Sequence, residues 1–152
     1  LYFIIFFDKL IIFMIFFHFI KYKMKLLIKT LIFGGIILAI DLPWLMFYMK
    51  GLYQDLFSKL NLKMSGSIIA AVLAYAVMII SFPFLIEDKD ENKMLLRAAV
   101  LGLVIYGTYG FTLSAILPKY DILFALKETI WGIFLYTIAT KLTNMIFKKI
   151  NV

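Results

Sequence analysis

The sequence predicts an all-α integral membrane protein, built as a four-helix up-and-down transmembrane bundle. Of the 152 residues, 64% are hydrophobic and only 16% are charged, and the mean hydropathy is +1.00. A soluble chain of this length could not bury so much apolar surface. Four apolar stretches are each long enough to cross about 30 Å of hydrocarbon. Because short polar connections separate these stretches, we expect neighbouring helices to be antiparallel.

The remaining composition excludes several functional classes. The chain has no cysteine, which excludes disulfides, thiolate nucleophiles and Cys-ligated metals. Its single histidine, His18, argues against a histidine metal site or a Ser-His triad, and we expect no metal and no cofactor. The net charge of +7 comes from Lys and Arg residues scattered between apolar runs. We expect these residues to set topology and contact the lipid bilayer, and we expect no nucleic acid partner.

The first 23 residues differ in composition from the rest of the chain. Thirteen of them are Ile or Phe, and none is Gly, Ala or Pro. Residues 1–23 are either an extra N-terminal apolar helix or AT-rich upstream sequence translated ahead of a start at Met24; we favour the second interpretation. Asp8 and Lys9 support it, because each charge costs roughly 2.5 to 3.5 kcal/mol at the centre of a membrane helix. Residues 24–152 then form one four-span transmembrane domain.

The first half of that domain contains two predicted spans. The first, residues 26–49, includes Pro43, which removes one backbone hydrogen bond and should bend the helix. A polar, amphipathic link over residues 51–66 separates it from the second span, residues 67–86. The charged turn EDKDENK ends the second span and starts the return of the chain.

The second half contains the third and fourth spans. In the third, residues 94–117, Gly102 and Gly110 share a stripe with a tyrosine, and such small residues let helices approach closely. A tight turn at Pro118 leads into the fourth span, residues 122–147, which is long enough to tilt or to extend past the membrane.

Basic residues near the span ends predict the orientation. If the Met24 end is cytoplasmic, eight Lys or Arg residues lie on that side and five lie on the other. This difference favours cytoplasmic N- and C-termini for residues 24–152.

Two acidic residues lie inside predicted spans, where ionisable groups are costly and tend to face the bundle interior. Asp41 lies roughly 18 Å from one interface and 13 Å from the other, at 1.5 Å per helical residue. Trp44 follows it at i+3, on nearly the same helical face. Glu128 in the fourth span is likewise followed by Trp131. So short a repeated pattern is better explained by chance than by an internal repeat.

Depth along the helices predicts that polar side chains from four spans form one layer. Asp41, Tyr75, Tyr109 and Glu128 all lie at similar heights in the outer half of the membrane. If they face inward, they form a buried polar layer, to which Tyr106 contributes from the third span. Two interpretations remain open: a glycine-based packing seam whose tyrosine hydroxyls satisfy stray carbonyls, or a water-filled or ligand-binding pocket.

At these residues the sequence resembles an uncharacterised family of small membrane proteins, domain of unknown function 2177. The family has an Asp-x-x-Trp-Leu in the first span, a Tyr-Gly-Thr-Tyr-Asp followed by Leu-Thr in the third, and an Asp-x-x-Trp-Gly in the last. The matching positions are Asp41, Trp44 and Leu45; Tyr106, Gly107, Thr108, Tyr109 and Thr112; and Glu128, Trp131 and Gly132. The resemblance covers residues 26–144. Gly110 stands where the family usually has Asp, and Glu128 replaces Asp.

Three functions from different classes fit this pattern, and the family has no established activity that would choose between them. The chain binds or moves a small solute, lipid-like molecule or proton through the layer, for which we expect a homo-oligomer. Alternatively, it is an intramembrane lipid-modifying enzyme with one carboxylate as general base and the other as acid, or a structural subunit without a ligand. The candidate site residues are Asp41, Trp44, Tyr75, Tyr106, Tyr109, Thr112, Glu128 and Trp131.

The link over residues 51–66 has two interpretations. Leu52, Leu56 and Leu60 share an apolar face with Tyr53 and Phe57. This pattern fits a short helix lying in the membrane interface, which we favour, or a cap over the outer side of the pocket.

Overall fold

The computed structural model describes residues 2–63 and 65–150, with side chains described from Met14 onward. Its helices are α1 (Tyr2–Pro43), the π-helical segment η1 (Trp44–Met49), α2 (Lys50–Lys59), α3 (Ile68–Ser81), the π-helical segment η2 (Phe82–Ile86), α4 (Glu91–Ile116) and α5 (Ile122–Lys149). There is no strand within these described ranges. Four continuous helical units are long and apolar enough to span a membrane: Met14–Lys59, Ile68–Ile86, Glu91–Ile116 and Ile122–Lys149. The predicted all-α membrane class is therefore confirmed.

The first helix continues further than the sequence predicted. We expected it to end near Met49, but α1, η1 and α2 follow one another without a break as far as Lys59. The wide π-helical turn after Pro43 explains the difference. Proline lacks a backbone N–H donor, and the π-helical turn allows the helix to continue past it. In this segment the backbone N–H of Lys50 donates to the carbonyl of Leu45, five residues earlier. The helical part of the predicted link therefore extends the first span.

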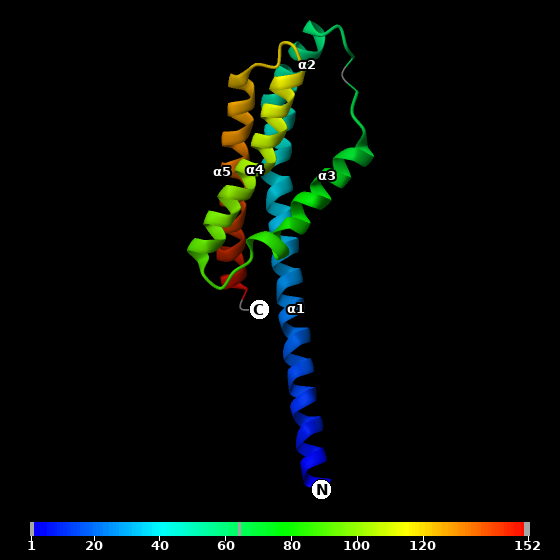
Figure 1. The fold of residues 1–152 in the computed structure, drawn as a ribbon, viewed down its shortest axis with the longest axis vertical. Helices are drawn as coiled ribbons and strands as arrows, with labels where there is room; N and C mark the ends of the chain where they lie inside the picture. The colour runs from blue at the N-terminus through cyan, green and yellow to red at the C-terminus, as the bar shows by residue number, and fades with distance from the viewer. Residues whose placement is uncertain (1, 64, 151–152) are drawn as a thin grey trace.

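Helix α5 packs along α4 and also contacts the C-terminal half of α1, whereas α3 leans outward (Figure 1). The N-terminal part of α1 projects beyond the other helices, and α2 lies at the opposite end of the molecule (Figure 1). Ile68 and Ile69 at the start of α3 are 82% and 74% exposed. Helix α3 approaches α1 only toward its C-terminal end, which leaves space between α3 and α4 higher up.

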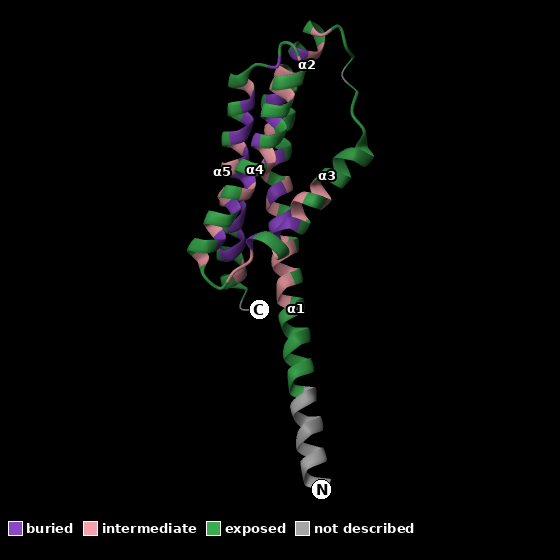
Figure 2. Ribbon diagram, in the orientation of Figure 1, coloured by how far each residue is buried: buried purple, intermediate pink, exposed green. Residues whose placement is uncertain are grey.

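The buried residues gather where α1, α4 and α5 meet (Figure 2). Phe33 of α1 packs against Phe82, with ring centroids 4.7 Å apart, and against Tyr136 of α5. Gly102 permits the closest contact between α4 and α5, because a Cβ atom there would overlap the backbone of Gly132. The close packing of these two helices fixes Tyr106 on α4 relative to Glu128 and Trp131 on α5.

Nothing in this arrangement tests whether residues 1–23 are native. Helix α1 begins at Tyr2 and runs through this segment without interruption. Asp8 and Lys9 lie outside the described side chains, so the argument from their charges stays a prediction.

Candidate functional site

Asp41 joins three helices inside the molecule. Asp41 lies on α1 and is only 3% exposed. One carboxylate oxygen accepts a hydrogen bond of 2.9 Å from the hydroxyl of Tyr75 on α3. The other accepts one of 2.8 Å from the indole Nε1 of Trp131 on α5. Asp41 is therefore a clamp between α1, α3 and α5.

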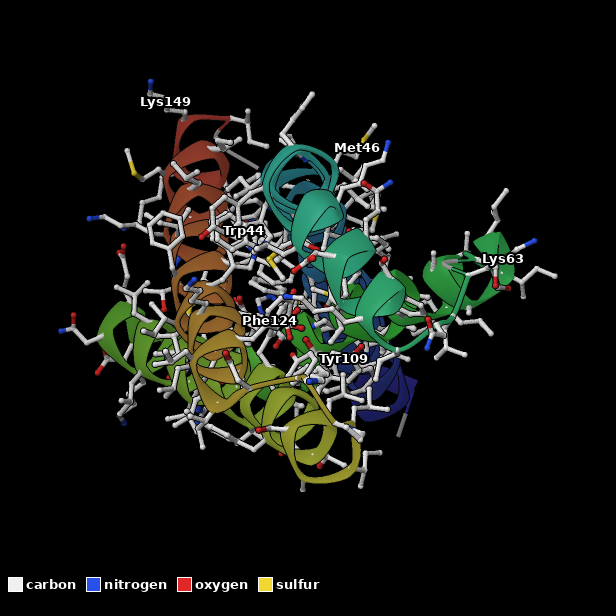
Figure 3. All side chains as sticks on the ribbon, turned by 90° about the horizontal axis from the view of Figure 1, so that it is seen from above. Trp44, Met46, Lys63, Tyr109, Phe124 and Lys149 are labelled. Atoms are coloured by element: carbon white, nitrogen blue, oxygen red, sulfur yellow. The ribbon has the colours of Figure 1, made fainter. Side chains whose placement is uncertain are left out.

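The two acid-x-x-Trp patterns meet at this clamp. Trp131 of the second pattern donates to the acid of the first, and its indole also stacks on Trp44, with ring centroids 4.1 Å apart and planes 8° apart. Tyr48 stacks on Trp44 as well, at 4.2 Å. Seen from the α2 end, Trp44 points into the space beside α5, while Met46 points outward (Figure 3). The stack fixes the plane of Trp131 and so directs its N–H at Asp41.

Glu128 forms a second clamp at the α2 end of the bundle. It is 6% exposed, and its two carboxylate oxygens accept hydrogen bonds from the hydroxyls of Tyr53 and Tyr120. Tyr120 lies in the turn between α4 and α5 and is 2% exposed. Burial, then the hydrogen bond to Glu128 and its negative charge, raises the pKa of Tyr120 well above its usual range. This hydroxyl therefore stays protonated and remains a donor.

Tyr53 and Tyr120 were absent from the predicted site, because both lie in segments that the sequence assigned to connections. Tyr53 belongs to α2, whose residue Leu56 packs in a small apolar cluster with Tyr120 and Ala125. Helix α2 thus covers the Glu128 end of the site. This geometry favours the cap over the interfacial helix that we preferred. The available signal was a tyrosine on the apolar face of the amphipathic link.

The third span contributes less uniformly than its sequence pattern suggests. Tyr106 of α4 lies within electrostatic range of both Asp41 and Glu128, and its ring packs directly over Gly132. Tyr109 is 53% exposed, at the edge of the layer.

Thr112 does not join the layer. It is exposed and lines a separate depression with Gly107 and Thr108 on another face of α4. The reason is helical geometry: six residues after Tyr106, the chain has turned by about 600°, so Thr112 points away from the face that Tyr106 presents.

Neither buried acid has a basic partner among the described residues. Arg97 pairs with Asp88, near the N-terminal end of α4. Each carboxylate oxygen of Asp41 and Glu128 already accepts a hydrogen bond from a neutral donor. The geometry is thus better suited to holding helices together than to presenting a free general base.

A cavity of about 490 Å³ lies between α3 and α4, beside this layer. Its lining residues are Leu73, Ala74, Val77, Met78, Ile105, Tyr106 and Tyr109. Val77 is 67% exposed, so the cavity opens on the outer surface of the bundle. Its walls are almost entirely apolar, and Tyr106 and Tyr109 contribute their rings.

Comparison with known proteins agrees with this architecture. A family model described as "Predicted membrane protein (DUF2177)" matches residues 26–145. Searches of curated proteins and of solved structures found no match. The matched region contains both acid clamps and the cavity between α3 and α4, and it excludes the first 25 residues. The chain therefore belongs to the DUF2177 family of predicted membrane proteins.

Proposed function

We propose that this multi-pass membrane protein binds a lipid-like amphipathic molecule in the cavity between α3 and α4. The apolar chain of the ligand occupies the cavity, with the rings of Tyr106 and Tyr109 at one edge. The cavity is the observation that supports this proposal most directly. Its volume of about 490 Å³ lies within the range of small-molecule sites, roughly 300 to 1,000 Å³.

The chemistry of the walls selects the class of ligand. Leu73, Val77 and Ile105 offer no hydrogen bonds, so a hydrated solute would lose its water without replacement. An acyl or isoprenoid chain makes no hydrogen bonds with water, so it loses none when it enters the cavity. The two tyrosines at one edge contribute their rings to this apolar wall. Because the cavity opens sideways, a ligand can enter from within the bilayer.

The wider setting of the site follows from the charge distribution. In our proposal both ends of residues 24–152 are cytoplasmic, which places the cavity in the outer half of the membrane. The bilayer then supplies the ligand. One chain provides both cavity walls, so the site itself does not require a homo-oligomer, and oligomerisation would instead serve transport.

Blocking the cavity tests the proposal. The probe is a single-chain amphipath with a diazirine near the end of its chain. We expect Val77→Trp to lower the saturable photo-crosslinking of this probe by at least about fivefold, because the indole fills the cavity. Protein in vesicles is labelled, and the modified peptides are mapped by mass spectrometry. Label should concentrate in residues 73–78 and 105–109.

Val72→Trp is the matched control. Val72 is also an exposed valine of α3, at 61%, but it does not line the cavity. It should leave the labelling unchanged. Equal labelling of wild type and Val77→Trp, or label spread evenly over all lipid-facing helices, would contradict the proposal.

A structural function is the second candidate, and the two clamps favour it. Asp41 connects three helices and Glu128 connects α5 to α2 and to the α4–α5 turn. In this case the acids hold the helices together and the protein has no ligand. An intramembrane enzyme has less support, because every oxygen of the two carboxylates already accepts a hydrogen bond from a neutral donor.

A further inference from the structure

A second cavity, of about 610 Å³, lies at the end of the molecule opposite α2. It is lined by Tyr22, Lys29, Glu87, Asp88 and Lys89. These residues come from α1 and from the charged turn between η2 and α4. The turn begins directly after Ile86, the last residue of the second candidate span. The cavity therefore lies at the depth where a span meets the lipid headgroups.

One carboxylate oxygen in this cavity lacks a hydrogen-bond partner. Glu87 Oε1 pairs with Lys29 Nζ at 2.5 Å, and both side chains are only 17% exposed. Glu87 Oε2 is buried and accepts no hydrogen bond from the described residues. A buried polar atom without a partner costs about 1 to 3 kcal/mol, and more when it is charged. A ligand with N–H donors would remove that cost.

Charged side chains of both signs lie next to Glu87 in the turn. Asp88 pairs with Arg97 at 2.9 Å, and the backbone N–H of Asp90, assisted by Arg97, holds the pKa of Asp88 below its usual range. Lys89 is exposed and has no ion pair among the described side chains. Among the described residues, the lining of this cavity thus includes one lysine without an ion pair and one carboxylate oxygen without a hydrogen-bond partner.

We propose that this cavity binds the headgroup of a phospholipid that carries a primary amine, of the phosphatidylethanolamine type. The ammonium group donates to Glu87 Oε2, and the phosphate pairs with Lys89. The four charged lining residues sum to zero, which matches a zwitterion. A choline headgroup has no N–H donor, and a glycerol headgroup would bring net negative charge to Glu87 and Asp88. This site is independent of the cavity between α3 and α4.

The test is a binding titration of the purified full chain in detergent with short-chain phospholipids, read by native mass spectrometry. We expect the ethanolamine lipid to bind about tenfold more tightly than the choline lipid of the same chain length, because one charged hydrogen bond separates them. Glu87→Gln should abolish that preference while keeping an oxygen for Lys29. Lys89→Gln should weaken both lipids.

Three further variants serve as controls. Asp88→Asn changes a neighbouring charge without touching the Lys29 pair, and should reduce the preference for the ethanolamine lipid only in part. This variant replaces Glu87→Gln in the test if Glu87→Gln proves unstable. Lys63→Gln, at an exposed lysine outside the cavity, and Val77→Trp should change nothing. A failure of the α3–α4 proposal would therefore leave this titration intact.

Three results would overturn the proposal. Equal affinity for ethanolamine and choline lipids would show that no amine is recognised. Tighter binding of phosphatidylglycerol would show that only the lysines matter. Binding of soluble phosphoethanolamine as tightly as the lipid would assign the cavity to a free metabolite instead.

Discussion

Gly102→Ala is expected to lower the free energy of unfolding by about 3 kcal/mol, the upper end of the range for overpacking. A Cβ atom at this position would overlap the carbonyl oxygen and carbon of Gly132 and the backbone nitrogen of Ile133. These are backbone atoms on a neighbouring helix, so no side chain can move aside to make room. Helices α4 and α5 must separate, and the ring of Tyr106 loses its packing contact with Gly132. Unfolding of the purified protein in mixed detergent micelles measures the effect.

Gly35→Ala is the matched control for that substitution. Gly35 also lies within a helix, but a Cβ atom there would meet nothing within 4 Å. Alanine has the higher helix propensity, by up to about 1 kcal/mol, so Gly35→Ala should be neutral or slightly stabilising. Equal losses in both variants would mean that α4 and α5 do not approach each other as closely as the structure shows.

Asp41→Leu is expected to lower the free energy of unfolding by about 2 kcal/mol. The substitution leaves the hydroxyl of Tyr75 and the indole N–H of Trp131 without their acceptor. Each unsatisfied donor costs about 1 to 3 kcal/mol in soluble proteins, whereas hydrogen bonds between membrane helices average about 0.6 kcal/mol. The cost per donor is expected to lie between these values, which gives about 2 kcal/mol for the two donors. Thermal unfolding in detergent, followed by circular dichroism, gives the change.

Asp41→Asn separates the clamp from any role of the charge. The amide oxygen can still accept from Trp131, and the amide nitrogen can donate to the hydroxyl oxygen of Tyr75. We expect a loss of under about 1 kcal/mol. If Asp41→Leu is as stable as the wild type, Asp41 does not hold the helices together. A loss of amphipath labelling with unchanged stability would then assign the acid to the ligand.

The depth of the polar residues could be predicted because the helical rise is fixed. Counting 1.5 Å per residue placed Asp41 level with Tyr75, and the structure brings them into a hydrogen bond. Inward orientation of the two acids followed from the cost of exposing a charge to hydrocarbon. These arguments need no knowledge of how the helices pack.

The partners of Glu128 could not be predicted by the same reasoning. Tyr53 reaches Glu128 only because the helix continues past Met49, and that continuation depends on the wide turn after Pro43. A proline in a sequence predicts a bend or an end and does not distinguish them. Tyr120 required knowledge of how the α4–α5 turn folds back over α5.

The outward lean of α3 was also beyond the sequence. The residues of α3 are apolar nearly all round, so no polar face indicates which side meets the bundle. For this reason the cavity between α3 and α4, and the exposure of Tyr109 at its edge, emerged only from the structure. Helical spacing likewise placed Thr112 in a motif but not on a face.

A cryo-electron microscopy map of the full chain in a lipid nanodisc tests the central claim most directly. The predicted result is elongated density in the cavity between α3 and α4, ending beside Tyr106 and Tyr109, with Asp41 and Glu128 directed inward. The contradicting result is α3 packed closely against α4 without a cavity, or the two acids facing lipid.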